Sequence, residues 1–164
     1  MTVLDARQLP SGEASLNPFV VVDDAAGLVE FMVGVFDGTE NEAARTPTPD
    51  GRLIHAEVVL GGPKVMLSDR LDGWPARPGL LQVWVDDVAA TLQAAVERGA
   101  RMITPPSPFY GETTVGRVQD PWGNLWWLYA PSPGQPDPTP AWEGGDDTVF
   151  RTIDQAMKGL AAER

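Results

Sequence analysis

The sequence predicts an α+β fold made of two tandem β-α-β-β-β modules and a C-terminal amphipathic helix. The prediction rests on an internal repeat whose register is visible at two places. The motif VDD at residues 22–24 recurs at 85–87, 63 positions later. The glycine turn at 62–63, which precedes KVML, recurs at 123–124 before LWWL, 61 positions later. One short insertion or deletion explains the difference, so both halves follow the same order of elements.

The first half contains one helix and four extended segments. Residues 16–22 are apolar and β-branched, which is typical of a strand. Residues 23–36 predict a helix, because apolar side chains recur there at helical spacing: Leu28, Phe31, Met32 and Val35. Segments 42–46, 53–60 and 63–69 predict three more strands, and Gly61-Gly62 predicts a hairpin turn between the last two.

The second half repeats this order. Residues 80–85 predict a strand, 86–99 a helix, and 100–105, 114–120 and 124–130 three strands. The predicted helix places four apolar residues on one face: Val88, Leu92, Ala95 and Val96. The Asp pairs at 23–24 and 86–87 each stand where a strand ends and a helix begins. We interpret them as N-caps that favour the positive helix end, rather than as catalytic carboxylates.

The composition of the chain suggests four segments. We expect a leader at residues 1–14, a folded domain at 15–131 (module one 15–69, module two 79–131), a Pro/Gly-rich linker at 132–146 and a helix at 147–164. The last helix carries an apolar stripe: Val149, Phe150, Ile153, Met157 and Leu160. Such a helix needs an apolar surface, and the sequence leaves open whether it docks in cis, across a dimer or on another protein.

Composition excludes several classes of function. The 164 residues contain no cysteine and one histidine, which removes disulfides, thiolate chemistry and sites that need two imidazoles. A net charge of −11 disfavours nucleic acid and anionic membrane surfaces as partners. No segment has the pattern of a secretory signal or the length of a membrane span. We therefore expect a soluble, cytoplasmic protein.

The repeated modules resemble the vicinal oxygen chelate superfamily, which contains glyoxalase I, extradiol dioxygenases and bleomycin-resistance proteins. Three stretches are similar to its PhnB-like branch: NPFVVVDDAAGLVEFMVGVF, LIHAEVVLGGPKVMLSD and YGETTVGRVQDPWGNLWWL. The resemblance covers residues 15–131. It implies a curved eight-stranded mixed sheet around a cleft, and a homodimer with modules paired within or between chains.

The resemblance also implies where a metal would bind. In metal-dependent members, His or Glu ligands come from the first and last strands of each module, which correspond here to Asn17, Met66, Leu80 and Trp127. Only Asn17 offers an oxygen suited to a divalent cation. We therefore predict no metal and no cofactor, and expect neither glyoxalase nor dioxygenase chemistry.

Alternation along the strands predicts what lines the cleft instead. The predicted lining is apolar and aromatic with a few polar groups, which is typical of a pocket for a small organic ligand. It consists of Asn17, Phe19, Met66, Ser68, Leu80, Gln82, Trp84, Trp127 and Tyr129. Tyr110 and Arg117 are expected to flank the cleft mouth. The alternative is that the aromatic residues simply fill a core.

These residues support one main hypothesis and two alternatives. The main hypothesis is a metal-free protein, similar to bleomycin-resistance proteins, that binds or sequesters an apolar or aromatic compound in the cleft, in a context such as antibiotic resistance. The first alternative is an isomerase or lyase that uses His55 and Glu57, which share a strand face, for acid–base chemistry. A histidine hydrogen-bonded within the sheet explains the same pair. The second alternative is an interaction protein that acts through its C-terminal helix.

Overall fold

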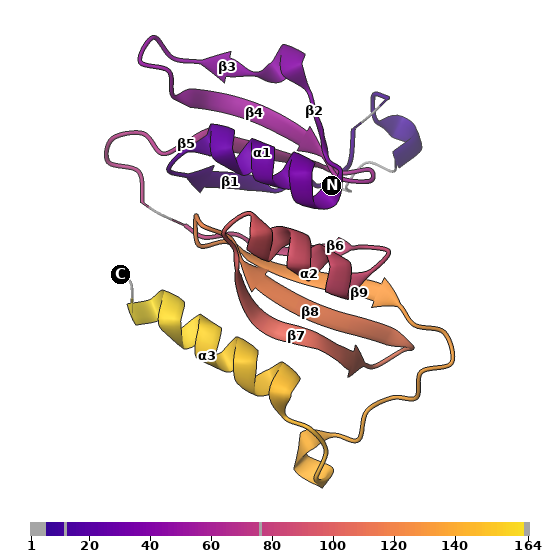
Figure 1. Ribbon diagram of the computed structural model, residues 1–164. Coiled ribbons are helices and arrows are strands. Elements are labelled where there is room, and N and C mark those ends of the chain that lie inside the picture. Colours follow the sequence, from indigo (N-terminus) through magenta and orange to yellow (C-terminus); the bar gives the residue numbers. More distant parts are fainter. Residues whose placement is uncertain (1–5, 12, 76, 163–164) are drawn as a thin grey trace. The chain divides into compact units, whose positions relative to one another are not determined.

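The computed structural model describes residues 6–11, 13–75 and 77–162, and shows two compact units, Met1–Pro78 and Gly79–Arg164 (Figure 1). Each unit has a mixed β-sheet with a crossover helix on one face, so the predicted α+β class is confirmed. Part of the predicted leader and the last two residues of the predicted C-terminal helix lie outside the described residues. None of the helices in the described ranges is long and apolar enough to cross a membrane.

The first unit has a five-stranded sheet in the order β1-β5-β4-β2, with β3 paired to β4. Strand β1 is parallel to β5, and the other pairs are antiparallel. Its elements are η1 (Ala6–Gln8), β1 (Phe19–Val22), α1 (Ala25–Phe36), β2 (Thr39–Glu40), η2 (Glu42–Ala44), β3 (Thr46–Pro47), β4 (Leu53–Val59) and β5 (Lys64–Asp69).

The second unit has a four-stranded sheet in the order β6-β9-β8-β7, with β6 parallel to β9. Its elements are β6 (Leu80–Trp84), α2 (Val88–Glu97), β7 (Arg101–Phe109), β8 (Thr113–Gln119), β9 (Leu125–Pro131), η3 (Ala141–Glu143) and α3 (Thr148–Ala162). The two sheets therefore repeat the same order of parallel and antiparallel neighbours, as the sequence repeat predicts.

The predicted helix caps are confirmed in both units. The Asp24 carboxylate accepts a hydrogen bond from the Gly27 amide, and Asp87 does the same for Ala90. Each cap satisfies one of the amides that a helix leaves without a partner at its start. Both helices then bury their apolar faces against the adjacent sheet, except that Val96 is exposed.

Two strand predictions in the first unit are wrong in part. The first strand begins at Phe19 instead of residue 16, because the Asn17 side chain bonds the Ala14 carbonyl and the Lys64 amide, and Pro18 has no amide hydrogen to donate. Residues 42–44 form the 3₁₀ turn η2 instead of a strand. The amide of Ala44 there bonds the Asn41 carbonyl, so a local turn replaces sheet pairing.

Strand β7 extends four residues beyond the predicted end at 105, through Pro105, Pro106 and Pro108. Proline cannot donate a hydrogen bond to a strand ladder and is therefore rare inside sheets. Because β7 lies at the edge of the sheet, it needs partners on one side only and tolerates these prolines. The extension carries Phe109 into the sheet.

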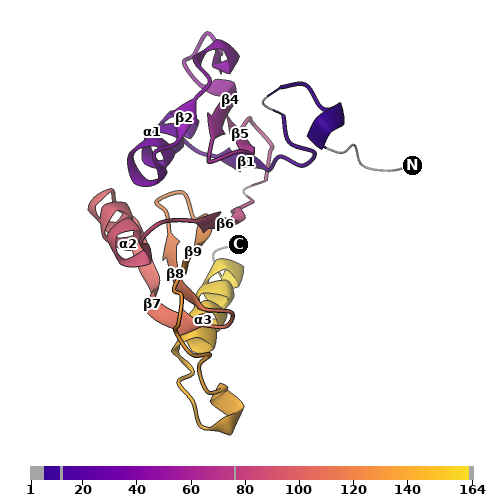
Figure 2. The ribbon, with the colours of Figure 1, turned by 90° about the vertical axis from the view of Figure 1, so that its right-hand side faces the viewer.

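The face of each sheet directed away from its crossover helix is called here the distal face. Helix α3 packs on the distal face of the second unit, beside β7 and opposite α2 (Figures 1 and 2). Ile153, Ala156 and Leu160 of α3 cluster with Ile103, Leu125 and Trp127 of the sheet, and Val149 is buried in the first turn of the helix. The predicted stripe is therefore rotated, because Phe150 and Met157 are exposed. In this structure α3 docks in cis.

Asp120 organises the DPWGN turn between β8 and β9. This buried carboxylate accepts hydrogen bonds from the amides of Trp122 and Asn124, the Asn124 side chain and the Trp126 indole. Gly123 has φ of 90°, a conformation that other residues rarely adopt. Trp126 is fully buried, so its hydrogen bond to Asp120 ties the turn to the core.

Candidate functional site

The predicted lining residues of the second module share the distal face of its sheet. The register places them in three neighbouring pairs across β6 and β9: Leu80 with Leu125, Gln82 with Trp127, and Trp84 with Tyr129. In the first unit the register pairs Phe19 with Met66. Adding the repeat offsets of 63 and 61 residues to Phe19 and Met66 gives Gln82 and Trp127, which are paired in the second unit. The sequence repeat is therefore reproduced in the pairing of individual residues.

Four aromatic side chains, three on this face and Tyr110 directly after β7, form a continuous row of ring contacts. The ring centroids of Trp84 and Tyr129 are 5.5 Å apart, those of Tyr129 and Phe109 are 5.9 Å apart, and those of Phe109 and Tyr110 are 5.3 Å apart. We call these four residues the aromatic row. Such centroid separations are typical of tilted and edge-to-face aromatic contacts. Phe109 is not among the lining residues expected from the sequence, because the sequence predicts that its strand ends at residue 105.

Helix α3 divides the distal face into a covered part and an open part. Leu125 is buried beneath the helix, and Trp127 is partly buried in the same cluster. Trp84 is 58% exposed and Leu80 is 52% exposed within the described chain. The alternative that the aromatic residues only fill a core therefore applies in part to Trp127 and not to Trp84.

Arg117, which is expected to flank the cleft mouth, is instead buried within the second unit. Arg117 lies on the internal strand β8, opposite Trp127 on β9 and Thr104 on β7, and is 4% exposed. Its Nη1 donates to Thr104 Oγ1 at 3.1 Å and to the Val149 carbonyl of α3 at 2.7 Å. Its Cζ lies 5.3 Å from the centroid of Trp127. Sequence position places Arg117 on this face, but only the tertiary structure reveals the helix above it.

The predicted lining residues of the first unit differ in accessibility. Phe19 is 49% exposed and Met66 is half-buried, so both are available on the distal face. Asn17 precedes β1 and its amide is engaged with the neighbouring backbone. Ser68 is 1% exposed, and its hydroxyl has no hydrogen-bond partner in the described ranges.

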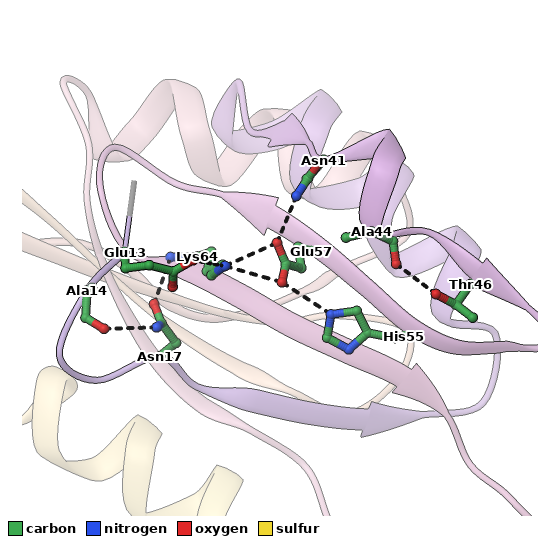
Figure 3. Close-up of polar contacts among 9 residues, drawn as sticks. All are labelled: Glu13, Ala14, Asn17, Asn41, Ala44, Thr46, His55, Glu57 and Lys64. Carbon is green, nitrogen blue, oxygen red and sulfur yellow. Dashed lines mark hydrogen bonds and ion pairs between the residues drawn. The ribbon is translucent and has the colours of Figure 1, made fainter. Parts of the chain in front are cut away.

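A polar cluster occupies the distal face of the first unit around Glu57 (Figure 3). Glu57 accepts from Asn41 Nδ2 at 3.0 Å and from Lys64 Nζ at 3.2 Å, and lies 3.2 Å from His55 Nε2. Lys64 also contacts Glu13 at 2.7 Å. The hydrogen bond from Asn41, followed by those from His55 and Lys64, lowers the pKa of Glu57 against the opposing effect of burial. Glu57 is therefore a weak base that orients its neighbours.

The side chains at the family's metal positions do not fit a divalent cation. Met66, Leu80 and Trp127 carry no oxygen or imidazole ligand, and the Asn17 oxygen already accepts the Lys64 amide. Within residues 6–11, 13–75 and 77–162, no three His, Cys, Asp or Glu side chains are grouped so as to hold a metal.

A separate cavity of about 220 Å³ lies at the start of α2. Its lining includes Asp86, Asp87, Pro106 and Ser132. One of its two acidic residues, Asp87, already caps α2. The cavity carries none of the predicted site residues.

Comparison with known proteins supports the family resemblance. The profile of the family described as Glyoxalase/Bleomycin resistance protein/Dioxygenase superfamily matches residues 15–128, more than half of the chain. The chain belongs to this superfamily. Over 130 residues it is 35% identical to the uncharacterized proteins Mb0911c of Mycobacterium bovis and Rv0887c of Mycobacterium tuberculosis, covering 73% of this chain and 84% and 75% of theirs.

Solved structures agree on the superfamily fold. TioX from Micromonospora is 21% identical with a TM-score of 0.58, covering 70% of this chain and 96% of TioX. A PhnB protein from Bacillus cereus, described as a putative 3-demethylubiquinone-9 3-methyltransferase, is 15% identical with a TM-score of 0.56, covering 71% of this chain and 99% of that protein. The fosfomycin resistance protein FosX from Mesorhizobium loti is 17% identical with a TM-score of 0.52, covering 72% of this chain and 92% of FosX. Helix α3 lies outside the residues that the superfamily profile matches.

Proposed function

We propose that this protein binds or sequesters a small apolar or aromatic compound without a metal, as the bleomycin-resistance branch of its superfamily does. The observation that carries the proposal is the aromatic row, with Trp84 more than half exposed beside Tyr129. Burying exposed aromatic surface against a flat ligand is favourable by roughly 25 cal/mol per Å² of apolar area. Gln82, exposed on the same face, supplies a polar group that could orient the ligand.

The proposal is tested with the neutral fluorescent probe N-phenyl-1-naphthylamine. Trp84→Ala should weaken its binding about tenfold, because truncating a stacking aromatic residue typically costs 1–3 kcal/mol. The matched control is Trp142→Ala, since Trp142 is 77% exposed in η3 and lies outside the aromatic row. Equal affinity of the two variants for the probe would refute the proposed site.

Native mass spectrometry of gently purified protein addresses the natural ligand and the assembly together. We expect a homodimer that carries an organic adduct and no metal ion. A stoichiometric divalent ion would contradict the proposal and favour a metal-dependent reaction.

A second candidate is an isomerase or lyase reaction at His55. It is favoured by one observation, that Glu57 contacts His55 Nε2 while Lys64 and Asn41 hold the carboxylate in place. This contact leaves the other ring nitrogen available for proton transfer. Turnover of any substrate that persists in His55→Ala would eliminate this candidate.

A further inference from the structure

The guanidinium of Arg117 is buried, and its contacts with the described residues are all to neutral groups. Its hydrogen bonds go to a threonine hydroxyl and a backbone carbonyl, both neutral. Its Nε is buried and has no hydrogen-bond acceptor in the described part of the chain. Among the described ranges, no Asp or Glu forms an ion pair with it. Burial lowers the pKa of Arg117, because it disfavours the charged form of the guanidinium.

The buried carboxylate of Asp120 in the same unit shows the contrast. Asp120 is as deeply buried as Arg117, but both of its oxygens accept hydrogen bonds, four in total. A buried charge is costly unless it is paired or fully hydrogen-bonded. Asp120 meets the second condition. Arg117 contacts two neutral oxygens and the Trp127 ring, but its Nε has no acceptor among the described residues.

The position of Arg117 relative to the aromatic row sets the distance between the ring of a ligand and a polar group that Arg117 would bind. Val115, two residues along β8, stands opposite Tyr129, just as Arg117 stands opposite Trp127. Two residues of a strand span about 7 Å. A ligand whose ring lies on Tyr129 and Trp84 would need a polar group about 7 Å away along the strand direction to bind Arg117. In this structure α3 covers that position, and Arg117 is buried.

We propose that Arg117 binds an acidic group of the ligand, a carboxylate or sulfonate carried by the aromatic compound that the row receives. This inference rests on the proposed function and names the chemical class of its ligand. The Val149 carbonyl holds the guanidinium in the absence of ligand, and the anion takes its place when the first turn of α3 lifts. A charged acceptor bonds a guanidinium more strongly than a neutral carbonyl does. Since the chain carries a net charge of −11, preference for an anion requires such a local positive group.

The first test needs no ligand. Arg117→Met removes a buried unpaired charge and keeps the apolar volume, while Thr104 Oγ1 retains its bond to Thr152. We expect the thermal midpoint of unfolding to equal or exceed that of wild type, as is found when buried charges are replaced by packed apolar residues. The control is Arg101→Met, which removes an exposed guanidinium bonded to Gln119. A midpoint below that of the control would show that Arg117 serves the fold and would overturn the proposal.

The second test compares two probes that differ in charge. 8-Anilinonaphthalene-1-sulfonate carries the acidic group, and N-phenyl-1-naphthylamine lacks it. We expect Arg117→Met to weaken sulfonate binding about tenfold or more and to leave the neutral probe unchanged, with Arg101→Met close to wild type for both.

The outcomes separate this inference from the proposed function. If Trp84→Ala weakens both probes while Arg117→Met weakens neither, the aromatic site stands and the acidic ligand class is wrong. If Trp84→Ala weakens neither probe, the proposed function fails. If Arg117→Met still weakens binding of the sulfonate in that case, Arg117 belongs to an anion site that does not involve the aromatic row.

Discussion

The docking of α3 in cis predicts that a disulfide will form between positions 104 and 152. The hydroxyl oxygens of Thr104 and Thr152 are 2.7 Å apart, so sulfur atoms at these positions come within bonding reach. The chain has no cysteine, so the double variant Thr104→Cys/Thr152→Cys contains only the designed pair. Each single variant serves as a control that has no partner for cross-linking.

The magnitude follows from the length of the closed loop. The two positions are 48 residues apart, for which the loss of chain entropy in the unfolded state corresponds to about 4 kcal/mol at 25 °C. Engineered disulfides often deliver less, so we expect the oxidised variant to gain about 2–4 kcal/mol over its reduced form. The reduced form should be about 1 kcal/mol less stable than wild type, since it lacks the hydrogen bond between the two threonines.

Urea denaturation with and without reductant measures this difference, and a non-reducing gel shows which chains are joined. We predict a cross-linked monomer whose urea midpoint of unfolding falls when reductant is added. A covalent dimer would show that α3 docks across two chains, and free thiols under oxidising conditions would show that α3 does not lie on β7. Either result would refute the cis packing. The oxidised form should also bind the sulfonate probe about tenfold more weakly, because the start of α3 is then held over Arg117.

Two further predictions concern the sheets. Gly116→Ala should destabilise the second unit by about 1–3 kcal/mol in urea denaturation, because its new Cβ would lie 2.6 Å from Val88 Cγ1 and 2.8 Å from Leu92 Cδ1; a neutral effect would mean that α2 packs less closely than described. Glu57→Gln should lower the free energy of unfolding above pH 4.5, the ordinary pKa of the carboxyl. The difference from wild type should vanish as pH falls through the lowered pKa of Glu57 in the folded state. A difference in the free energy of unfolding that persists in acid would show that the charge of Glu57 is not what stabilises the cluster.

The sequence repeat predicts the fold and much of the distal faces, because both depend on local patterns. The caps at Asp24 and Asp87 follow from helix starts, and alternation along β6 and β9 places Trp84 and Trp127 on one face. These features need only the period of a strand and the chemistry of a helix end.

The remaining features depend on tertiary context. Phe109 belongs to the aromatic row because an edge strand tolerates the prolines before it. The contact face of α3 is rotated from the predicted stripe, since residues 149, 153, 156 and 160 satisfy helical spacing as well as 150, 153, 157 and 160 do. The burial of Arg117 follows from that docking, so no pattern in its own strand could reveal it.

NMR of ¹⁵N-labelled protein, titrated with 8-anilinonaphthalene-1-sulfonate, tests the account most directly. The six tryptophan indoles give separate reporters, and the Nε–H of Arg117 gives another. We predict that the signals of Trp84 and Arg117 Nε–H shift together with probe concentration, while Trp74 and Trp142 remain unchanged. Shifts confined to Trp74 or Trp142, with Trp84 and Arg117 unaffected, would contradict a ligand site on the distal face of the second unit.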